Sequence, residues 1–339
     1  MKIPDHFLGC GIAVLTLAAP AFAAGPLERI RSASKLPELS LDALKRGEIV
    51  GARGQLGDFS TGVYAEACFF VRAPFETVGE KLMHWDTSKH RELEVSILRE
   101  YRWPAPLNTF DALTLSSARK EDRWLIERTW QATSSGDADG LHITSGEAAD
   151  FRNAARSVSP AERDKKVSEF WRKILGARNE AVASTGFKGL PRFSTSNIDI
   201  STEFKGLMKL APAIFSHFEP LLSTKPFNGK SSEEIAPYWQ QTLVRGHTTI
   251  HSGFLSSLKR SASWQVADCT YFTSDTYFMS LTLYELFPIE NGTLVWQINF
   301  VSAPFRSYLG GTDRFIASNQ MVKETAETIR LFRSDVEQR

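Results

Sequence analysis

The chain has 339 residues, of which 42% are hydrophobic and 23% are charged, and its formal net charge is +1. This composition is typical of a folded protein with a substantial core and excludes a largely disordered chain. The near balance of 40 basic and 39 acidic side chains gives no electrostatic reason to expect binding to nucleic acid or to acidic membrane surfaces.

The first 23 residues have the features of a cleavable secretory signal peptide. An apolar run over residues 7–17 breaks at Pro20 and meets Ala21-Phe22-Ala23, a small-x-small cleavage site. The run is shorter than the roughly 20 apolar residues of a transmembrane helix. Cys10 stands at its start, whereas a lipidated cysteine would follow it. We therefore expect cleavage after Ala23, a periplasmic or extracellular location, and no integral membrane segment after cleavage.

Alternating hydrophobicity predicts the first strands. Residues 48–52 and 62–72 show the period of two that is typical of half-buried strands. Ala73-Pro74 ends the second strand, and apolar residues at helical spacing predict a helix from there to about Trp85. Residues 93–101 are predicted to form the next strand.

A mainly helical segment is predicted over about residues 109–245. It contains three Ser/Thr-x-x-Glu signatures that are typical of helix starts, at Thr144 with Glu147, Ser159 with Glu162, and Ser231 with Glu234. The second signature precedes the most regular apolar stripe of the segment, and Gly186 lies just past the end of that stripe.

The C-terminal part predicts an antiparallel meander followed by one long helix. Four segments are rich in aromatic and β-branched residues, namely 247–258, 263–272, 276–287 and 293–301. The pair Asn291-Gly292 between the last two is typical of a type I′ hairpin turn. A single stripe then predicts a helix of about 25 residues, with Phe315, Ser318, Val322, Thr325, Ile329, Phe332 and Val336 on one face. The sheet is the apolar surface against which such a helix packs.

This order of elements resembles the START and polyketide-cyclase-like superfamily. The residues that carry the resemblance are Phe69-Phe70-Val71-Arg72-Ala73-Pro74-Phe75-Glu76-Thr77-Val78, then Gly292-Thr293-Leu294-Val295-Trp296 and the helix from Asp313. The resemblance implies a helix-grip fold, in which a curved antiparallel sheet wraps around a long C-terminal helix and encloses an apolar cavity. The chain departs from that pattern through the helical segment between Tyr101 and the later strands.

Nearly the full length is also similar to a group of uncharacterised exported bacterial proteins with Ser/Leu-rich lead-ins, a Phe-Trp helix and a Tyr-Trp segment like Tyr238-Trp239. That similarity implies a fold and an exported location but no activity. We therefore predict an α+β protein with a signal peptide over 1–23, a lead-in segment over 24–46 and a single domain over 47–339. The domain is expected to be a curved antiparallel sheet with the C-terminal helix packed across it, plus the helical insertion at about 109–245.

Two groups of histidines are candidate chemical sites. His247 and His251 would share a metal ion on a helix, but the β-branched residues between them favour a strand, on which they lie about 13 Å apart. His84, Asp86 and His90 surround the end of the first predicted helix of the domain. They either form an acid and base pair or cap and solvate that helix end.

The meander carries the candidate ligand residues. Trp264, Asp268, Tyr284 and Trp296 lie on strands where aromatic side chains alternate with a few polar groups, which is typical of a ligand cavity wall and equally of a sheet-to-helix core. Asp268 stands out because a carboxylate among aromatic strands must be paired or solvated. Cys68 and Cys269 either form a disulfide between two strands or remain buried thiols.

Three functions remain open from the sequence. The first is non-catalytic binding or carriage of a hydrophobic small molecule or lipid in a sheet-helix cavity. The second is an enzyme acting on a small hydrophobic substrate, with His84, Asp268 and Glu285 as its candidate groups. The third is a periplasmic protein-interaction module built on the helical insertion. No cofactor is expected, because the sequence has no Gly-rich phosphate loop with Lys that would indicate nucleotide binding. It also has no Gly-x-Ser-x-Gly elbow, so nucleophilic hydrolysis is unsupported.

Overall fold

The computed structural model describes residues 25–106, 108–135, 140–193, 197–224, 226–227, 234–305 and 312–338. The predicted signal peptide over 1–23, with Cys10, lies outside these residues, and so does Ser231. Within the described residues, no helix is both long and apolar enough to span a membrane.

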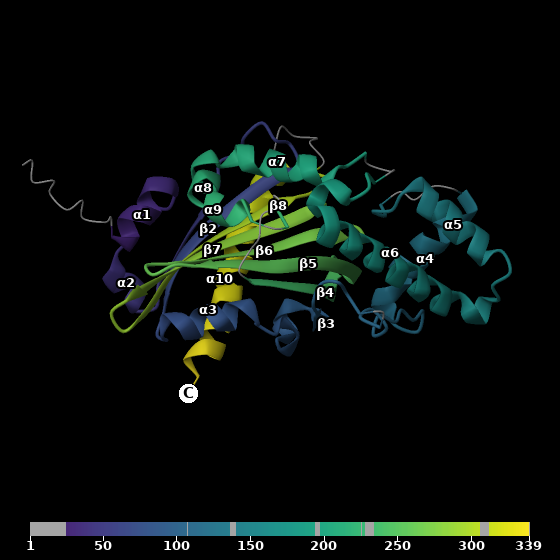
Figure 1. Cartoon of the computed structure of the whole chain (residues 1–339), viewed down its shortest axis with the longest axis horizontal. Coiled ribbons are helices and arrows are strands. Elements are labelled where there is room, and N and C mark those ends of the chain that lie inside the picture. The colour runs from purple at the N-terminus through teal and green to yellow at the C-terminus, as the bar shows by residue number, and fades with distance from the viewer. Residues whose placement is uncertain are drawn as a thin grey trace, which may run out of the picture.

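One antiparallel sheet of eight strands organises the chain, in the order β1-β2-β8-β7-β6-β5-β4-β3 (Figure 1). The strands are β1 (Ile49–Arg53), β2 (Gly62–Val71), β3 (Val95–Glu100), β4 (Glu234–Val244), β5 (His247–Lys259), β6 (Trp264–Thr273), β7 (Met279–Ile289) and β8 (Gly292–Ser302). The last five strands are neighbours in the sequence and in the sheet, so the predicted meander is confirmed and gains β4.

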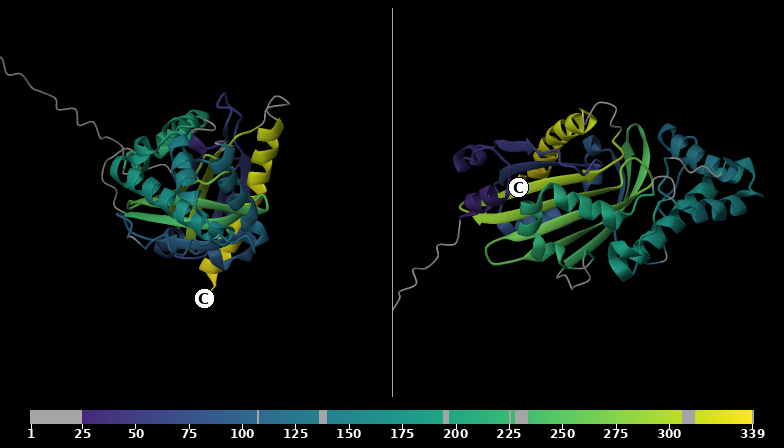
Figure 2. Two further views of the ribbon diagram at one scale, coloured as in Figure 1. Left: turned by 90° about the vertical axis from the view of Figure 1, so that its right-hand side faces the viewer. Right: turned by 90° about the horizontal axis from the view of Figure 1, so that it is seen from above.

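Helices cover both faces of the sheet. They are α1 (Pro26–Ala33), α2 (Leu41–Lys45), α3 (Phe75–Met83), α4 (Lys120–Ser135), α5 (Ser145–Ala155), α6 (Arg163–Thr185), α7 (Ile200–Leu210), α8 (Pro212–His217), α9 (Glu219–Leu222) and α10 (Thr312–Glu337). The yellow α10 lies on one side of the sheet and the teal and green helices lie on the other (Figure 2). The predicted α+β fold with a long C-terminal helix against a curved antiparallel sheet is therefore correct.

We call the two sides the α10 face, which packs on α3 and α10, and the insertion face, which packs on α1 and α4 to α9. The pairing register of the strands shows to which face each side chain points. Asp268 pairs with Thr282, and Thr282 pairs with Asn299, so these three side chains share the α10 face. Trp296, three positions from Asn299, therefore points to the insertion face.

The insertion face explains why β2 differs from its prediction. Alternation predicted a half-buried strand, yet every residue of β2 is buried. The reason is that Tyr64, Cys68 and Phe70 belong to the large core on the insertion face, while Phe69 and Val71 belong to the smaller core under α3 and α10.

Helix starts were predicted well where the signature precedes a helix and poorly where it precedes a strand. Thr144 and Glu147 form a complete capping box at the start of α5. Ser159 and Glu162 form another, which opens a short 3-10 turn before α6. The prediction from Glu234 was wrong, because residues 234–244 form β4 rather than a helix. The helical insertion therefore ends before β4.

The hairpin between β7 and β8 is confirmed, but its turn is not the predicted type I′. Ile289 pairs with Gly292, so the turn residues are Glu290 and Asn291, and only Asn291 has positive φ, at 66°. Gly292 is required for a different reason. A Cβ on it would lie 2.3 Å from the carbonyl oxygen of Val71. A close approach of two strands thus selects the glycine.

The stripe on α10 is only partly correct. Thr325, Ile329 and Phe332 are buried against the sheet. Phe315 was predicted to join them, but it is 43% exposed and stacks under the guanidinium of Arg53. The packing of α10 on the sheet is partly polar, since Asn299 Nδ2 of β8 donates a 2.5 Å hydrogen bond to Thr325 Oγ1 of α10.

Candidate functional site

A cavity of about 280 Å³ lies on the α10 face. Residues of α3, the turns after it, β3, α10 and the middle strands of the sheet line it. They are Leu82, Met83, Trp85, Thr87, Leu93, Val95, Leu98, Glu100, Tyr238, Gln240, Leu255, Asp268, Thr270, Tyr277, Ser280, Tyr284 and Thr328. The α3 side and β3 contribute mostly apolar groups and the sheet contributes mostly polar groups. A ligand there would meet an apolar wall and a hydrogen-bonding floor.

Asp268 is the central polar group of this floor. The Tyr238 hydroxyl donates a 2.7 Å hydrogen bond to Asp268 Oδ1 and lies 3.1 Å from the Thr270 hydroxyl. Burial raises the pKa of Asp268 to about 6, although the bond from Tyr238 acts in the opposite direction. The carboxyl group therefore titrates within reach of neutral pH.

The bond between Tyr238 and Asp268 crosses an intervening strand. Tyr238 lies on β4 and Asp268 on β6, with β5 between them. Gly253 of β5 pairs with Tyr238, and a Cβ at this glycine would lie 2.4 Å from the tyrosine hydroxyl oxygen. Only a residue without a side chain leaves this path open, so Gly253 is part of how the site is built.

Two further tyrosines complete the floor. The Tyr277 hydroxyl lies 2.8 Å from His251 Nδ1, and His251 Nε2 contacts the hydroxyl of Thr242. Burial lowers the pKa of His251 to about 4, so the imidazole is neutral at pH 7. Tyr284 has no hydrogen-bond partner among the described residues, and its hydroxyl is available to a ligand.

Glu100 is the exposed member of the lining and marks the mouth of the cavity. Its Oε2 lies 3.0 Å from His84 Nδ1. The other residues of the predicted histidine cluster have different partners. Asp86 caps the following turn at the Ser88 amide, and His90 Nε2 lies 2.9 Å from Asp335 on α10. His84, Asp86 and His90 are therefore not brought together.

The structure divides the four predicted ligand residues into three groups. Asp268 and Tyr284 line the cavity. Trp264 shares their face but packs against α3, where a Cβ on Gly79 would lie 2.2 Å from its ring. Trp296 lies on the opposite face and donates a 3.2 Å hydrogen bond to Glu66. The two tryptophans are core residues.

The candidate enzyme groups do not converge either. Glu285 is fully buried on the insertion face, where Arg29 of α1 lies 2.7 Å away and His217 of α8 also contacts it. Asp268 lies on the other face and His84 at the mouth of the cavity. No single cleft contains these three groups.

The remaining titratable candidates have structural partners. His247 Nε2 lies 2.6 Å from Asp275 Oδ2, and His251 belongs to the cavity network, so the two imidazoles have separate partners. In the part of the chain that the structure describes, no three His, Cys, Asp or Glu side chains are grouped to hold a metal ion.

Cys68 and Cys269 are both buried free thiols. They lie on β2 and β6, which are separated by β8 and β7. Three strand spacings correspond to about 14 Å along the sheet, far beyond the reach of a disulfide. Burial raises the pKa of Cys68 to about 12.

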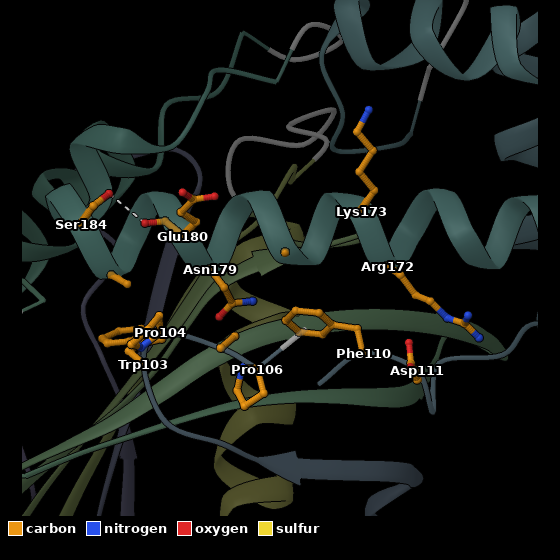
Figure 3. Close-up of a pocket in the computed structure, with 13 residues that line it drawn as sticks. Trp103, Pro104, Pro106, Phe110, Asp111, Arg172, Lys173, Asn179, Glu180 and Ser184 are labelled. Carbon is orange, nitrogen blue, oxygen red and sulfur yellow. Dashed lines mark hydrogen bonds between the residues drawn. The ribbon is translucent and has the colours of Figure 1, made fainter. Parts of the chain in front are cut away.

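A larger hollow of about 720 Å³ lies elsewhere, between the loop that follows β3 and one side of α6 (Figure 3). Trp103 and Phe110 form one wall and α6 forms the other. Two of its polar groups serve the fold: Arg172 Nε donates to the carbonyl of Leu113, and Asn179 Nδ2 donates to the hydroxyl of Ser252. The carboxylates of Asp111 and Glu180 in its lining are exposed to solvent. We therefore favour the smaller cavity, where polar groups remain available.

Sequence reasoning identified Asp268 and Tyr284 but missed Tyr238, Thr270 and Tyr277. Tyr238 was missed because β4 was assigned to the helical insertion. Thr270 was not among the predicted ligand residues, although the alternation of β6 places it on the same strand face as Asp268 and is the signal that could have identified it. Tyr277 precedes β7, in a turn where no periodicity operates.

Comparisons of this chain with protein-family models, with curated proteins and with solved structures find no match. The functional argument therefore depends on the geometry of the cavity.

Proposed function

We propose that this protein binds a small, largely apolar molecule with one polar end in the cavity on the α10 face, and that it does so without catalysing a reaction. The observation that carries the proposal is the pairing of an apolar wall with a floor whose Asp268 and Tyr284 have unused hydrogen-bonding capacity. Polar groups inside a protein are normally satisfied. Their availability beside an open volume is typical of a binding site.

The volume limits the ligand. Pockets for small molecules span about 300–1,000 Å³, so a cavity of about 280 Å³ is at the lower end. A compact molecule or the end of a single chain fits, whereas the whole of a two-chain lipid does not. The proposed ligand is accordingly smaller than a membrane lipid.

We also propose that the protein is exported and that it shares the helix-grip arrangement of the START and polyketide-cyclase-like superfamily. The signal-like residues 1–23 support export. The long C-terminal helix against a curved antiparallel sheet, with a cavity between sheet and helices, supports the second proposal.

A second candidate is an enzyme in which Asp268 is the general base. It is favoured by the pKa of Asp268 near 6 and by the Tyr238 hydroxyl beside it, since a base with a pKa near the working pH is efficient. One measurement distinguishes a binding protein from an enzyme. A carrier returns its ligand unchanged after prolonged incubation, and an enzyme returns a product that Asp268→Asn does not form.

Native mass spectrometry of protein purified from its own source tests binding. We expect a co-purifying small molecule in the wild type, and its loss in Leu255→Phe, which places a larger apolar side chain in the cavity lining. Leu190→Phe makes the same change outside the cavity lining and is expected to retain the ligand. A consistently empty wild-type protein would contradict the proposed function.

A further inference from the structure

The charges around the cavity have one sign. The lining contains two carboxylates, Asp268 and Glu100, and none of its residues is Lys, Arg or His. His84, which contacts the lining residue Glu100 at the mouth, is 52% exposed and is paired with Glu100 rather than with Asp268. In a low-dielectric cavity, the electrostatic potential of such an unbalanced negative charge is stronger than it would be in water.

Among the described residues, five other carboxylates are buried, and each has at least two partners or a basic one. Glu66 and Glu203 each accept two hydrogen bonds from uncharged groups, and the other three have a basic partner. Glu285 lies 2.7 Å from Arg29, Asp122 lies 2.5 Å from Arg119, and Asp275 lies 2.6 Å from His247. Each of these partners comes from the fold itself. A buried carboxylate without such a partner is strongly disfavoured.

Asp268 is different. Among the described residues, its hydrogen-bond donor is the neutral Tyr238, which engages Oδ1. A carboxylate has about four lone-pair positions, so most of its accepting capacity is directed to the cavity. The partner that the fold provides for Glu285 is missing at Asp268.

Aromatic side chains surround the same volume. Trp85, Tyr238, Tyr277 and Tyr284 are all members of the lining. The faces of aromatic rings attract cations, and several rings with a carboxylate are a known means of binding substituted ammonium groups. Neither an anion nor a neutral acceptor would gain from this combination.

From the carboxylate, the aromatic rings and the absence of basic residues in the cavity lining, we infer that the ligand of this cavity is a small organic cation, an amine or a quaternary ammonium compound whose charged nitrogen lies beside Asp268. This inference rests on the proposed function and specifies its ligand class. The apolar wall from α3 and β3 contacts the hydrocarbon part of the molecule.

The test uses two probes of the same shape, choline and its neutral isostere 3,3-dimethylbutan-1-ol, titrated into the full chain and followed by NMR. We expect choline to bind at least tenfold more tightly than the alcohol. Asp268→Asn is expected to weaken choline binding at least tenfold and to leave the alcohol unchanged. Asp150→Asn, which removes the same charge from an exposed site on α5, is the matched control and is expected to change neither.

Equal binding of the two probes, or tighter binding of the alcohol, overturns the inference and leaves the proposed function standing. If neither probe binds, the co-purified molecule decides. A neutral or acidic molecule overturns the inference alone, a basic or quaternary one supports it, and an empty protein overturns the proposed function as well. Should Asp268→Asn not fold, Tyr284→Leu removes one ring from the lining and is expected to weaken choline binding about threefold or more.

Discussion

Two carboxylates on opposite faces of one sheet have different surroundings. On the insertion face, Glu285 of β7 is held by Arg29 and His217. On the α10 face, the hydrogen-bond partner of Asp268 of β6 among the described residues is a tyrosine hydroxyl, and a cavity lies beside it. The first arrangement is complete and stabilises the fold, whereas the second is incomplete and is suited to a ligand. This difference is the reason that we propose the ligand site on the α10 face.

Removing the arginine partner of Glu285 should have the largest effect on stability. Arg29→Met leaves the fully buried Glu285 without its arginine. We expect the free energy of unfolding to fall by about 3–5 kcal/mol, measured by urea denaturation at pH 7. Lys173→Met removes an exposed partner of Asp150, and this control should change stability by less than about 0.5 kcal/mol. A similar small effect for Arg29→Met would show that Glu285 does not depend on it.

Removing the charge of Asp268 should stabilise the unliganded protein. The pKa of Asp268 is raised to about 6 from 3.8, so between these values the folded state binds a proton that the unfolded state does not. The free energy of unfolding contributed by this group therefore falls as pH rises from about 4 to 6. Asp268→Asn removes this loss, and we expect it to be more stable than the wild type by about 1–3 kcal/mol at pH 8.

The measurement is thermal or urea unfolding of both proteins at pH 4 and pH 8. At pH 4 the difference should be much smaller, because Asp268 is then protonated in the folded state and close to half-protonated in the unfolded state. The pKa values of His142 and His251 are lowered to about 4 by burial, which makes the folded state less stable in acid. Both proteins share this effect, so it cancels from the difference. A variant less stable than the wild type at pH 8 would argue against an incompletely paired Asp268.

Packing on the α10 face offers a third comparison. Gly79→Ala places a Cβ about 2.2 Å from the ring of Trp264. Although alanine favours a helix, we expect a net loss of about 1–3 kcal/mol in the free energy of unfolding. Gly176→Ala in α6 is the matched control, since its nearest neighbour would be at 3.9 Å, and it should gain about 0.5–1 kcal/mol. Equal effects from the two changes would remove the proposed role of Trp264 as a core residue.

The smallest effect concerns the thiols. Cys68 and Cys269 are buried and lie on strands that are not neighbours. We expect the intact mass to be that of the reduced form for these two residues, and reaction with a thiol reagent only after denaturation. A mass lower by two hydrogens that returns on reduction would show that the two cysteines are bridged.

Much of the fold could be predicted because periodicity is local. The alternation in β2 and β8, the capping box at Thr144 and the stripe of α6 each depend on residues close in sequence. The prediction failed at Glu234, where a capping signature precedes a strand, because tertiary pairing with β5 overrides local propensity.

The site was less predictable because it depends on strand register. Alternation placed Trp296 on one face of its strand, but only the pairing of Glu285 with Trp296 shows that this face is the one opposite Asp268. The bond from Tyr238 to Asp268 crosses β5 at Gly253, a contact between residues 30 positions apart. No local pattern encodes such a contact.

The most direct test of this account is a high-resolution structure of the protein purified from its own source. The account predicts a small non-protein molecule in the cavity on the α10 face, with a positively charged nitrogen beside the Asp268 carboxylate. A cavity that holds only water, or one filled by side chains from α3 and α10, would contradict it.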